Sequence, residues 1–326
     1  MMQIGLIGIG AGAAAGLLFA SVTSGSWLAV GLFYTAPLPI MIAGIGWSHW
    51  SALIAALTAA AGLSLAFGGM FFFAFLAGAG IPAWWLSYLT MLARPAAPAV
   101  GPDPAAVEWY PPGRLVVWAA VLGALVVVIG IANFGLDADS FRQGLRAALS
   151  RMLKVETGLP ADQALPLPGV SNARRIVDLL VEVIPPAAAV IAALTNLFNL
   201  WLAARVVKFS GRLNRPWPDL SSMTIPPMVA IALALAVIMS FLGGLVGIIA
   251  GVVSASLLIA YGVLGFAVLH AITRGISSRG LLIGGVYAAV MVFGWPMLVL
   301  CLLGLADTAV GLRARLARKR GPPTII

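Results

Sequence analysis

Runs of about 20 apolar residues, hardly interrupted by charge, recur along almost the entire chain. Hydrophobic residues make up 62% of the sequence and charged residues only 9%, whereas a soluble domain needs roughly 25% charged residues to cover its surface. Because lipid offers no hydrogen bonds to the backbone, such a chain must span as helices or as a closed barrel. The runs 115–131 and 228–241 lack the alternation of barrel strands. We therefore expect an all-α, polytopic transmembrane helical bundle.

Nine apolar runs can be distinguished, and two of them are broken. Pro37 and Pro39 interrupt the second run, and Gly78, Gly80 and Pro82 interrupt the fourth. Backbone groups freed by such breaks either line a substrate cavity or are satisfied by neighbouring helices. If the second run re-enters without crossing, eight spans remain. The runs cover about residues 4–22, 27–47, 51–67, 70–92, 115–134, 187–207, 226–241, 244–270 and 281–305.

Charge and hydropathy divide the chain into four segments. Transmembrane helices are expected in 1–134 and 179–308, a polar loop in 135–178 and a basic tail in 309–326. Within the polar loop, apolar residues recur at helical spacing between arginines, which is typical of an amphipathic helix on the bilayer surface. The alternative is a helix packed on a small soluble subdomain. The apolar positions are Phe141, Leu145, Leu149 and Met152.

The basic residues indicate membrane topology rather than nucleic-acid binding. The net charge is +9, but Lys and Arg lie between apolar runs and in the tail, where they face anionic headgroups. With nine spans, the polar loop and the tail share a side that carries eleven basic residues against eight. We predict a multi-pass protein of the bacterial inner membrane with a cytoplasmic C-terminus and a cytoplasmic amphipathic helix. No Lys or Arg precedes Arg94, so the first run is expected to be a retained span and not a signal peptide.

Small residues spaced by four form two stripes. Each stripe would allow the backbone of a neighbouring helix to approach closely. The neighbour is either another helix of this chain or a transmembrane partner subunit. The first stripe is Gly8, Gly12, Gly16 and Ala20, and the second is Gly243, Gly247 and Gly251.

Polar residues inside the runs are scarce. Asn196 and Asn199 lie three apart in the sixth run, and Tyr261 lies in the eighth. These three side chains are our candidates for binding an unknown small molecule, with interhelical hydrogen bonds as the alternative. Asp307 closes the last run and is expected to meet Arg274, Arg279 or Arg313 at the surface.

Several enzyme signatures are missing. The sequence has no Walker A motif, no His-Glu-x-x-His motif and no Gly-x-Ser-x-Gly elbow, and Cys301 is its sole cysteine. We cannot assemble converging ionisable groups for catalysis. No catalytic residues, metal site or cofactor are therefore expected, and an intramembrane lipid-modifying enzyme ranks as a third possibility.

The C-terminal third resembles the YybS-like bacterial membrane proteins, a family of unknown function. The resemblance lies in Trp217-Pro218 followed by Pro226, in the segment 261–266, and in the segment 303–307 with Arg313. Tyr261 stands where the family often has Gln. The family is distantly similar to substrate-binding subunits of energy-coupling-factor transporters, whose first helix contacts its partner through an Ala-x-x-x-Ala face. Ala11 and Ala15 have that spacing.

These observations favour a protein of transport type. We expect a small-molecule-binding transmembrane subunit that needs a partner for energy, because carboxylates that could drive it alone are missing mid-membrane. The alternative is a non-transporting scaffold of an envelope complex, assembled through the amphipathic helix and the basic tail.

Overall fold

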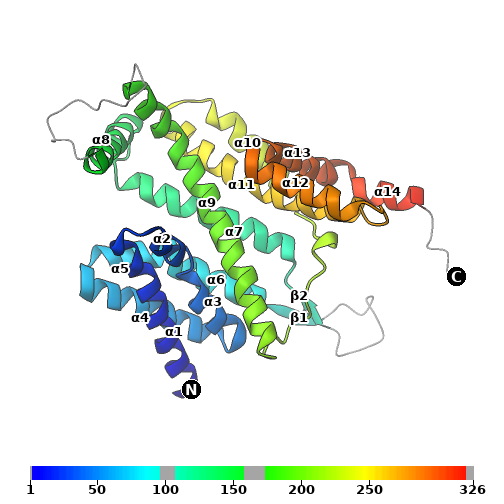
Figure 1. The fold of residues 1–326 in the computed structure, drawn as a ribbon, viewed down its shortest axis with the longest axis horizontal. Coiled ribbons are helices and arrows are strands. Elements are labelled where there is room, and N and C mark those ends of the chain that lie inside the picture. Colours follow the sequence, from blue (N-terminus) through cyan, green and yellow to red (C-terminus); the bar gives the residue numbers. More distant parts are fainter. Residues whose placement is uncertain (1, 96–106, 158–172, 321–326) are drawn as a thin grey trace. The chain divides into compact units, whose positions relative to one another are not determined.

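The computed structural model describes residues 2–95, 107–157 and 173–320, which are almost entirely helical (Figure 1). The chain forms two compact units. One comprises Met1–Ala119, Leu194–Pro227 and Ala260–Ile326, and the other comprises Ala120–Ala193 and Met228–Ile259. Long parts of α7 (Pro112–Ala132), α9 (Ala173–Phe209) and α11 (Gly244–Ile272) belong to each of the two units.

Within the part of the chain that the structure describes, seven helical segments are long and apolar enough to cross a membrane. Large apolar side chains on them lie uncovered by protein, including Leu65 at 91% and Leu17 at 74% exposure. Such surfaces are suited to lipid and not to water. The prediction of a helical protein with apolar helices suited to a membrane is thereby confirmed, whereas the number of spans stays a prediction. The segments are Met2–Ser24, Trp27–Gly46, His49–Phe67, Met70–Thr90, Pro112–Ala132, Arg175–Phe209 and Gly244–Ile272.

In the first unit, α1 (Met2–Ala20) packs along α4 (His49–Phe67). Gly8 and Gly12 are buried in this contact. A Cβ atom on Gly8 would lie 2.7 Å from Ile54 Cβ, and one on Gly12 would lie 2.7 Å from Thr58 Cβ. Because a real Cβ atom cannot come so close, these two positions accept only glycine without a shift of α4.

The two broken runs remain helical in different ways. The second consists of α2 (Trp27–Tyr34) and α3 (Pro37–Gly46), with Pro37 in the first turn of α3. The fourth consists of α5 (Met70–Phe75), a π-helical segment at Leu76–Gly80 and α6 (Ile81–Thr90). A π-helical turn is a frequent way to absorb a local break without ending the helix.

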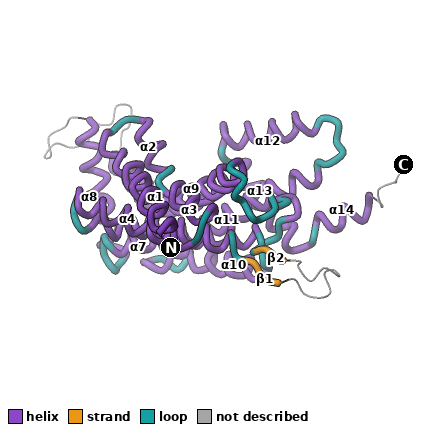
Figure 2. Tube along the Cα trace, turned by 90° about the horizontal axis from the view of Figure 1, so that it is seen from below, coloured by secondary structure: helices purple, strands orange, loops and turns teal. Residues whose placement is uncertain are grey.

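Two short strands follow α6 where the sequence indicated only a loop. The strands β1 (Ala93–Pro95) and β2 (Val107–Trp109) pair antiparallel and are orange in Figure 2. Across the pair, Arg94 and Glu108 form an exposed ion pair of 2.8 Å. Three residues are too few to show strand periodicity, so the sequence could not have indicated this pair.

The last apolar run, 281–305, is two helices instead of the single helix expected. They are α12 (Arg279–Phe293) and α13 (Pro296–Val310), joined by a tight turn that is visible in Figure 2. Gly294 has a φ of +69° and Pro296 starts α13, so the α12 ladder cannot continue through this point. At 15 residues each, both helices are about 22 Å long, which is less than the thickness of the hydrocarbon layer.

Close backbone contact joins α13 to α11. Gly265 lies against the carbonyl of Leu300, and Gly304 lies against the carbonyl of Tyr261. After α13, α14 (Leu312–Arg320) contains the basic residues of the tail.

The second unit contains α10 (Pro227–Ser240) and the expected amphipathic helix, α8 (Ala138–Thr157). The carboxylate of Asp137 caps α8 by accepting from the backbone N–H groups of Asp139 and Ser140. Phe141 is buried in the core of this unit, whereas Met152 is 65% exposed. The apolar stripe of α8 is therefore only partly covered by protein. The segment boundaries predicted at 134, 178 and 308 remain predictions.

Candidate functional site

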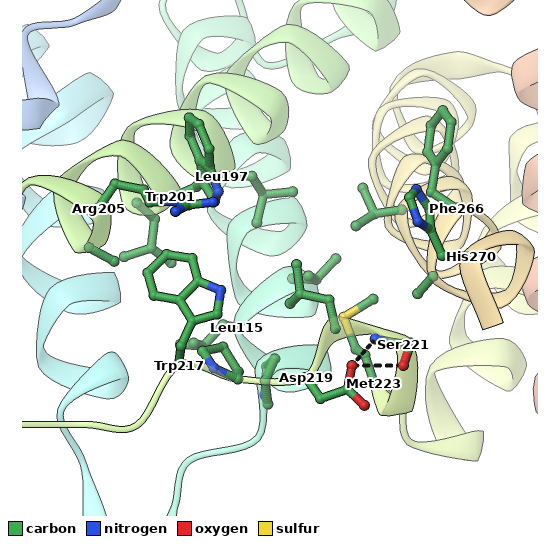
Figure 3. Close-up of a pocket in the computed structure, with 18 of the residues that line it drawn as sticks. Leu115, Leu197, Trp201, Arg205, Trp217, Asp219, Ser221, Met223, Phe266 and His270 are labelled. Atoms are coloured by element: carbon green, nitrogen blue, oxygen red, sulfur yellow. Dashed lines mark hydrogen bonds between the residues drawn. The ribbon is translucent and has the colours of Figure 1, made fainter. Parts of the chain in front are cut away.

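A cavity of about 1000 Å³ lies within the first unit. Its walls come from the last turns of α9 and α11, the first turns of α7 and α12, and the loop after α9. Figure 3 shows Trp201 and Arg205 on one wall and Phe266 and His270 facing them across the open space. Most of the lining is apolar, and the charged side chains are four arginines and one aspartate: Arg205, Arg215, Arg274, Arg279 and Asp219.

Two tryptophan rings hold the Arg205 side chain. Its guanidinium carbon lies 4.7 Å from the ring centre of Trp217 and 5.5 Å from that of Trp201. The ammonium of Lys208 lies 4.9 Å from the same Trp217 ring. A guanidinium that stacks on a ring keeps its N–H groups for other partners. The Nε of Arg205 is buried, and no hydrogen-bond partner for it is found among the described residues.

Arg215 anchors the loop after α9. The residue is 7% exposed, and its guanidinium donates to the carbonyl of Thr90 and to that of Tyr110, both at 2.8 Å. Burial lowers the pKa of this guanidinium, but the ordinary value is so high that the group stays charged. The loop is therefore fixed to the end of α6 and to the residue after β2.

Asp219 is held by its own loop. Its carboxylate accepts from the hydroxyl of Ser221 at 2.7 Å and from the backbone N–H of Ser221 at 3.0 Å. These bonds, and more weakly the nearby Arg274, lower the pKa of Asp219. Arg274 lies 3.5 Å from the carboxylate and also donates to Ser221. This cation and this anion of the lining thus compensate each other.

On the opposite wall, Arg279 lies beside His270. Its Nη2 donates to the carbonyl of His270 over 3.4 Å, and its Nε is buried with no partner in the described part of the chain. The Nε2 of His270 is 3.3 Å from the hydroxyl of Tyr287. The cavity therefore has an incompletely bonded arginine on each of two walls.

The expected partner of Asp307 is Arg313, but the pair is buried and does not lie at the surface. The Arg313 side chain is 17% exposed and that of Asp307 is 7% exposed. Arg313 donates twice to the carboxylate, at 2.7 and 3.0 Å, and also to the carbonyls of Ser221 and Met223. This clamp fixes the start of α14 to the loop that borders the cavity.

The residues predicted to bind ligand lie outside this cavity lining. Asn199 is fully buried and donates to the carbonyl of Tyr34 at 2.8 Å. The Pro37 break frees that carbonyl, because Leu38 bonds to Thr35 instead. Asn196 is 3% exposed and Tyr261 is fully buried. Asn199 thus makes an interhelical hydrogen bond, which is the alternative to ligand contact for this residue.

Only some residues of the two glycine stripes pack against a neighbouring helix. Gly16 makes ordinary contact with α4, and Gly243 has a positive φ in the turn before α11. Gly251 has no atom within 4 Å of where a Cβ would lie. Ala15, on the face that the resemblance implied for a partner, is fully buried within the chain. Ala20 is partly buried, and Gly247 is buried.

Sequence reasoning missed the cavity residues because they come from distant segments. Arg205 and Lys208 were visible only as basic residues at a span end, and Trp217 only as part of a proline-rich loop. A spacing of four between Trp201 and Arg205 places both on one helix face, which was the one available signal. Comparison with protein-family models, curated proteins and solved structures found no match for the chain.

Proposed function

We propose that this protein is a membrane-embedded, small-molecule-binding subunit of transport type that works with a partner. The cavity of about 1000 Å³ supports this proposal most directly, because ligand sites in proteins are largely apolar hollows with a few placed polar groups. The location of the cavity at helix ends gives a ligand access from the headgroup region. The resemblance to substrate-binding subunits of transporters implies the same class of role.

Native mass spectrometry of the full chain in detergent tests this function. The expected result is a retained small molecule or a copurified transmembrane subunit, and a Leu197→Trp variant that fills the cavity should lose the small molecule. A matched variant, Leu65→Trp, alters a side chain that is 91% exposed and outside the cavity lining. Retention of neither ligand nor partner by the unaltered chain would count against the function.

We infer the membrane orientation from hydrogen bonds within the first unit. Arg215 joins the loop after α9 to residues 90 and 110, and Arg313 joins α14 to residues 221 and 223. Segments so joined lie on one side, so an even number of crossings separates them. The helices α7 and α9 therefore form one pair of crossings. Because Arg274, which follows α11, bonds to Ser221 before α10, α10 and α11 form another pair, and α12 and α13 together return to the side from which they enter.

This arrangement changes the count of basic residues. The joined side has thirteen basic residues, and the segment that connects α7 to α9, counted together with the first turn of α9, has six. The positive-inside rule then places the cavity, α14 and the C-terminus in or facing the cytoplasm. It places α8 on the opposite side of the membrane, which differs from the cytoplasmic helix inferred from sequence.

A scaffold role is the second candidate. The structure leaves Met152 of α8 exposed at 65%, and such an apolar side chain can dock on a partner or on lipid. In a scaffold, charge reversal at Arg142 would release a partner protein and leave ligand retention unchanged. In a transport subunit, filling the cavity would have the larger effect.

A further inference from the structure

The cavity changes in polarity along both of its long helices. On α9, the lining runs from Leu194 and Leu197 to Arg205, and on α11 it runs from Val263 to His270. With a rise of about 1.5 Å per residue, Leu194 and Arg205 lie about 16 Å apart along the axis. The apolar part thus lies toward the interior of the span and the cationic part at the helix ends. This gradient matches an amphiphile whose charged head is at headgroup depth.

The charges at the polar end favour an anionic head. Asp219, the acidic residue of the lining, is already bonded to Ser221 and lies beside Arg274. Arg205 and Lys208 approach the same Trp217 ring, and neither forms an ion pair within residues 2–95, 107–157 and 173–320. Uncompensated cations at the edge of an apolar cavity are electrostatically complementary to an anion.

We propose that the cavity binds the phosphate-bearing head and adjoining apolar chain of an anionic membrane lipid. Arg205 and Arg279 would donate to the phosphate oxygens, since a guanidinium presents N–H groups in a fork that fits two such oxygens. The apolar walls would hold the start of the chain. This inference rests on the proposed function, because it assigns the ligand class of the same cavity.

Zwitterionic choline lipids fit the same site poorly. A choline group binds on aromatic faces through cation–π contact. The rings at this site are already in contact with Arg205 and Lys208, so the choline would meet like charge. Because cationic side chains already cover the tryptophan rings, we expect the cavity to prefer anionic lipids to choline lipids.

Titration of the full chain in detergent micelles tests the proposal. The probes are dioctanoyl phosphatidylglycerol, dioctanoyl phosphatidylcholine and inorganic phosphate, and binding is followed by calorimetry and tryptophan fluorescence. We expect the anionic lipid to bind about tenfold or more tightly than the choline lipid, as repulsion between the choline and the cations beside the rings would allow. Inorganic phosphate should bind weakly because it uses none of the apolar wall.

Three variants separate the polar and apolar contributions. Arg205→Gln and Arg279→Gln should each weaken binding of the anionic lipid about tenfold. Arg212→Gln is the matched control, because Arg212 also stacks on a tryptophan, Trp47 at 4.6 Å, but does not line this cavity. Leu197→Trp should weaken both lipids, and it keeps the test valid if an arginine variant fails to fold.

The possible results are decisive in both directions. Equal binding of the two lipids, unchanged binding by Arg205→Gln and Arg279→Gln, or inorganic phosphate binding as tightly as the lipid would overturn the proposal. If native mass spectrometry shows a retained water-soluble molecule displaced by Leu197→Trp, the lipid assignment fails while the proposed function stands. Lipid binding without a partner or transported molecule would leave the assignment in place and contradict the transport role.

Discussion

At the scale of single residues, the arginines near the cavity differ in what they bond. The guanidinium groups of Arg215 and Arg313 donate to backbone carbonyls, and that of Arg313 also donates to the Asp307 carboxylate. Arg205 and Arg279 each retain a buried Nε with no partner in the described segments. The first two therefore hold the fold together, and the second two are the arginines that we propose for the ligand. The sequence shows five identical side chains, counting Arg274, and gives no basis for this distinction.

Removing the Arg313 guanidinium should strongly destabilise the protein. Arg313→Met removes the guanidinium from the buried Asp307 carboxylate, which keeps only the backbone N–H of residue 313, and leaves the carbonyls of Ser221 and Met223 without their side-chain donor. Breaking a buried pair on one side costs about 3–5 kcal/mol, so the apparent Tm in detergent should fall by several degrees. Arg315→Met, two residues further along α14 and exposed, is the control. An equal Tm for the two variants would contradict the clamp, and Arg313→Met with Asp307→Leu should recover part of the loss.

The lowered pKa of Asp219 predicts a pH dependence. The pKa is lower in the folded state than in the unfolded state, so the ionised carboxylate stabilises the fold at neutral pH. This stabilisation is present above the unfolded value of about 4 and is lost as the pH falls through the folded-state pKa. Ser221→Ala removes the main hydrogen bond, so stability should be lost at a higher pH than in the unaltered chain.

Thermal unfolding between pH 7 and pH 3 measures this shift. Ser222→Ala is the matched control, because the Ser222 hydroxyl donates to the backbone carbonyl of Asp219 and not to its carboxylate. If both serine variants lose stability at the same pH, the Ser221 hydroxyl does not set the pKa.

At the scale of elements, glycine governs how closely α13 approaches α11. A Cβ atom on Gly265 would overlap the carbonyl of Leu300. Gly265→Ala should therefore push the helices apart and cost about 1–3 kcal/mol, as overpacking does. Gly251→Ala in the same helix meets no atom within 4 Å, so it should be neutral or slightly stabilising. The apparent Tm of both variants checks this, and a Gly265→Ala protein as stable as Gly251→Ala would contradict the packing.

Most helices could be predicted from apolar runs, because membrane burial imposes length and composition on them. The last run shows the limit of this argument. Its Trp295-Pro296 pair was visible, but proline is tolerated inside spanning helices, so hydropathy alone could not tell one helix from two. The cavity could not be predicted, since Trp217 reaches Arg205 only through a loop whose path depends on Arg215.

At the scale of the whole molecule, the orientation can be tested with single cysteines. In a Cys301→Ala background, one variant carries Ser277→Cys, in the loop between α11 and α12 on the cavity side of the membrane. The other carries Ser150→Cys, on α8. We expect a membrane-impermeant maleimide to label Ser150→Cys in intact spheroplasts and Ser277→Cys only after permeabilisation. Labelling of both positions under the same condition would show that α8 and the cavity side share one face.

The bond from Asn199 to the Tyr34 carbonyl spans 165 residues, and that from Arg215 to Thr90 spans 125. During translation, the first helices enter the bilayer long before either donor leaves the ribosome. The Tyr34 carbonyl then sits in hydrocarbon without its later partner, at a cost of several kcal/mol. The early helices thus finish folding only when α9 and its following loop arrive, and a nascent chain stopped before α9 would depend on the insertion machinery to shield that carbonyl.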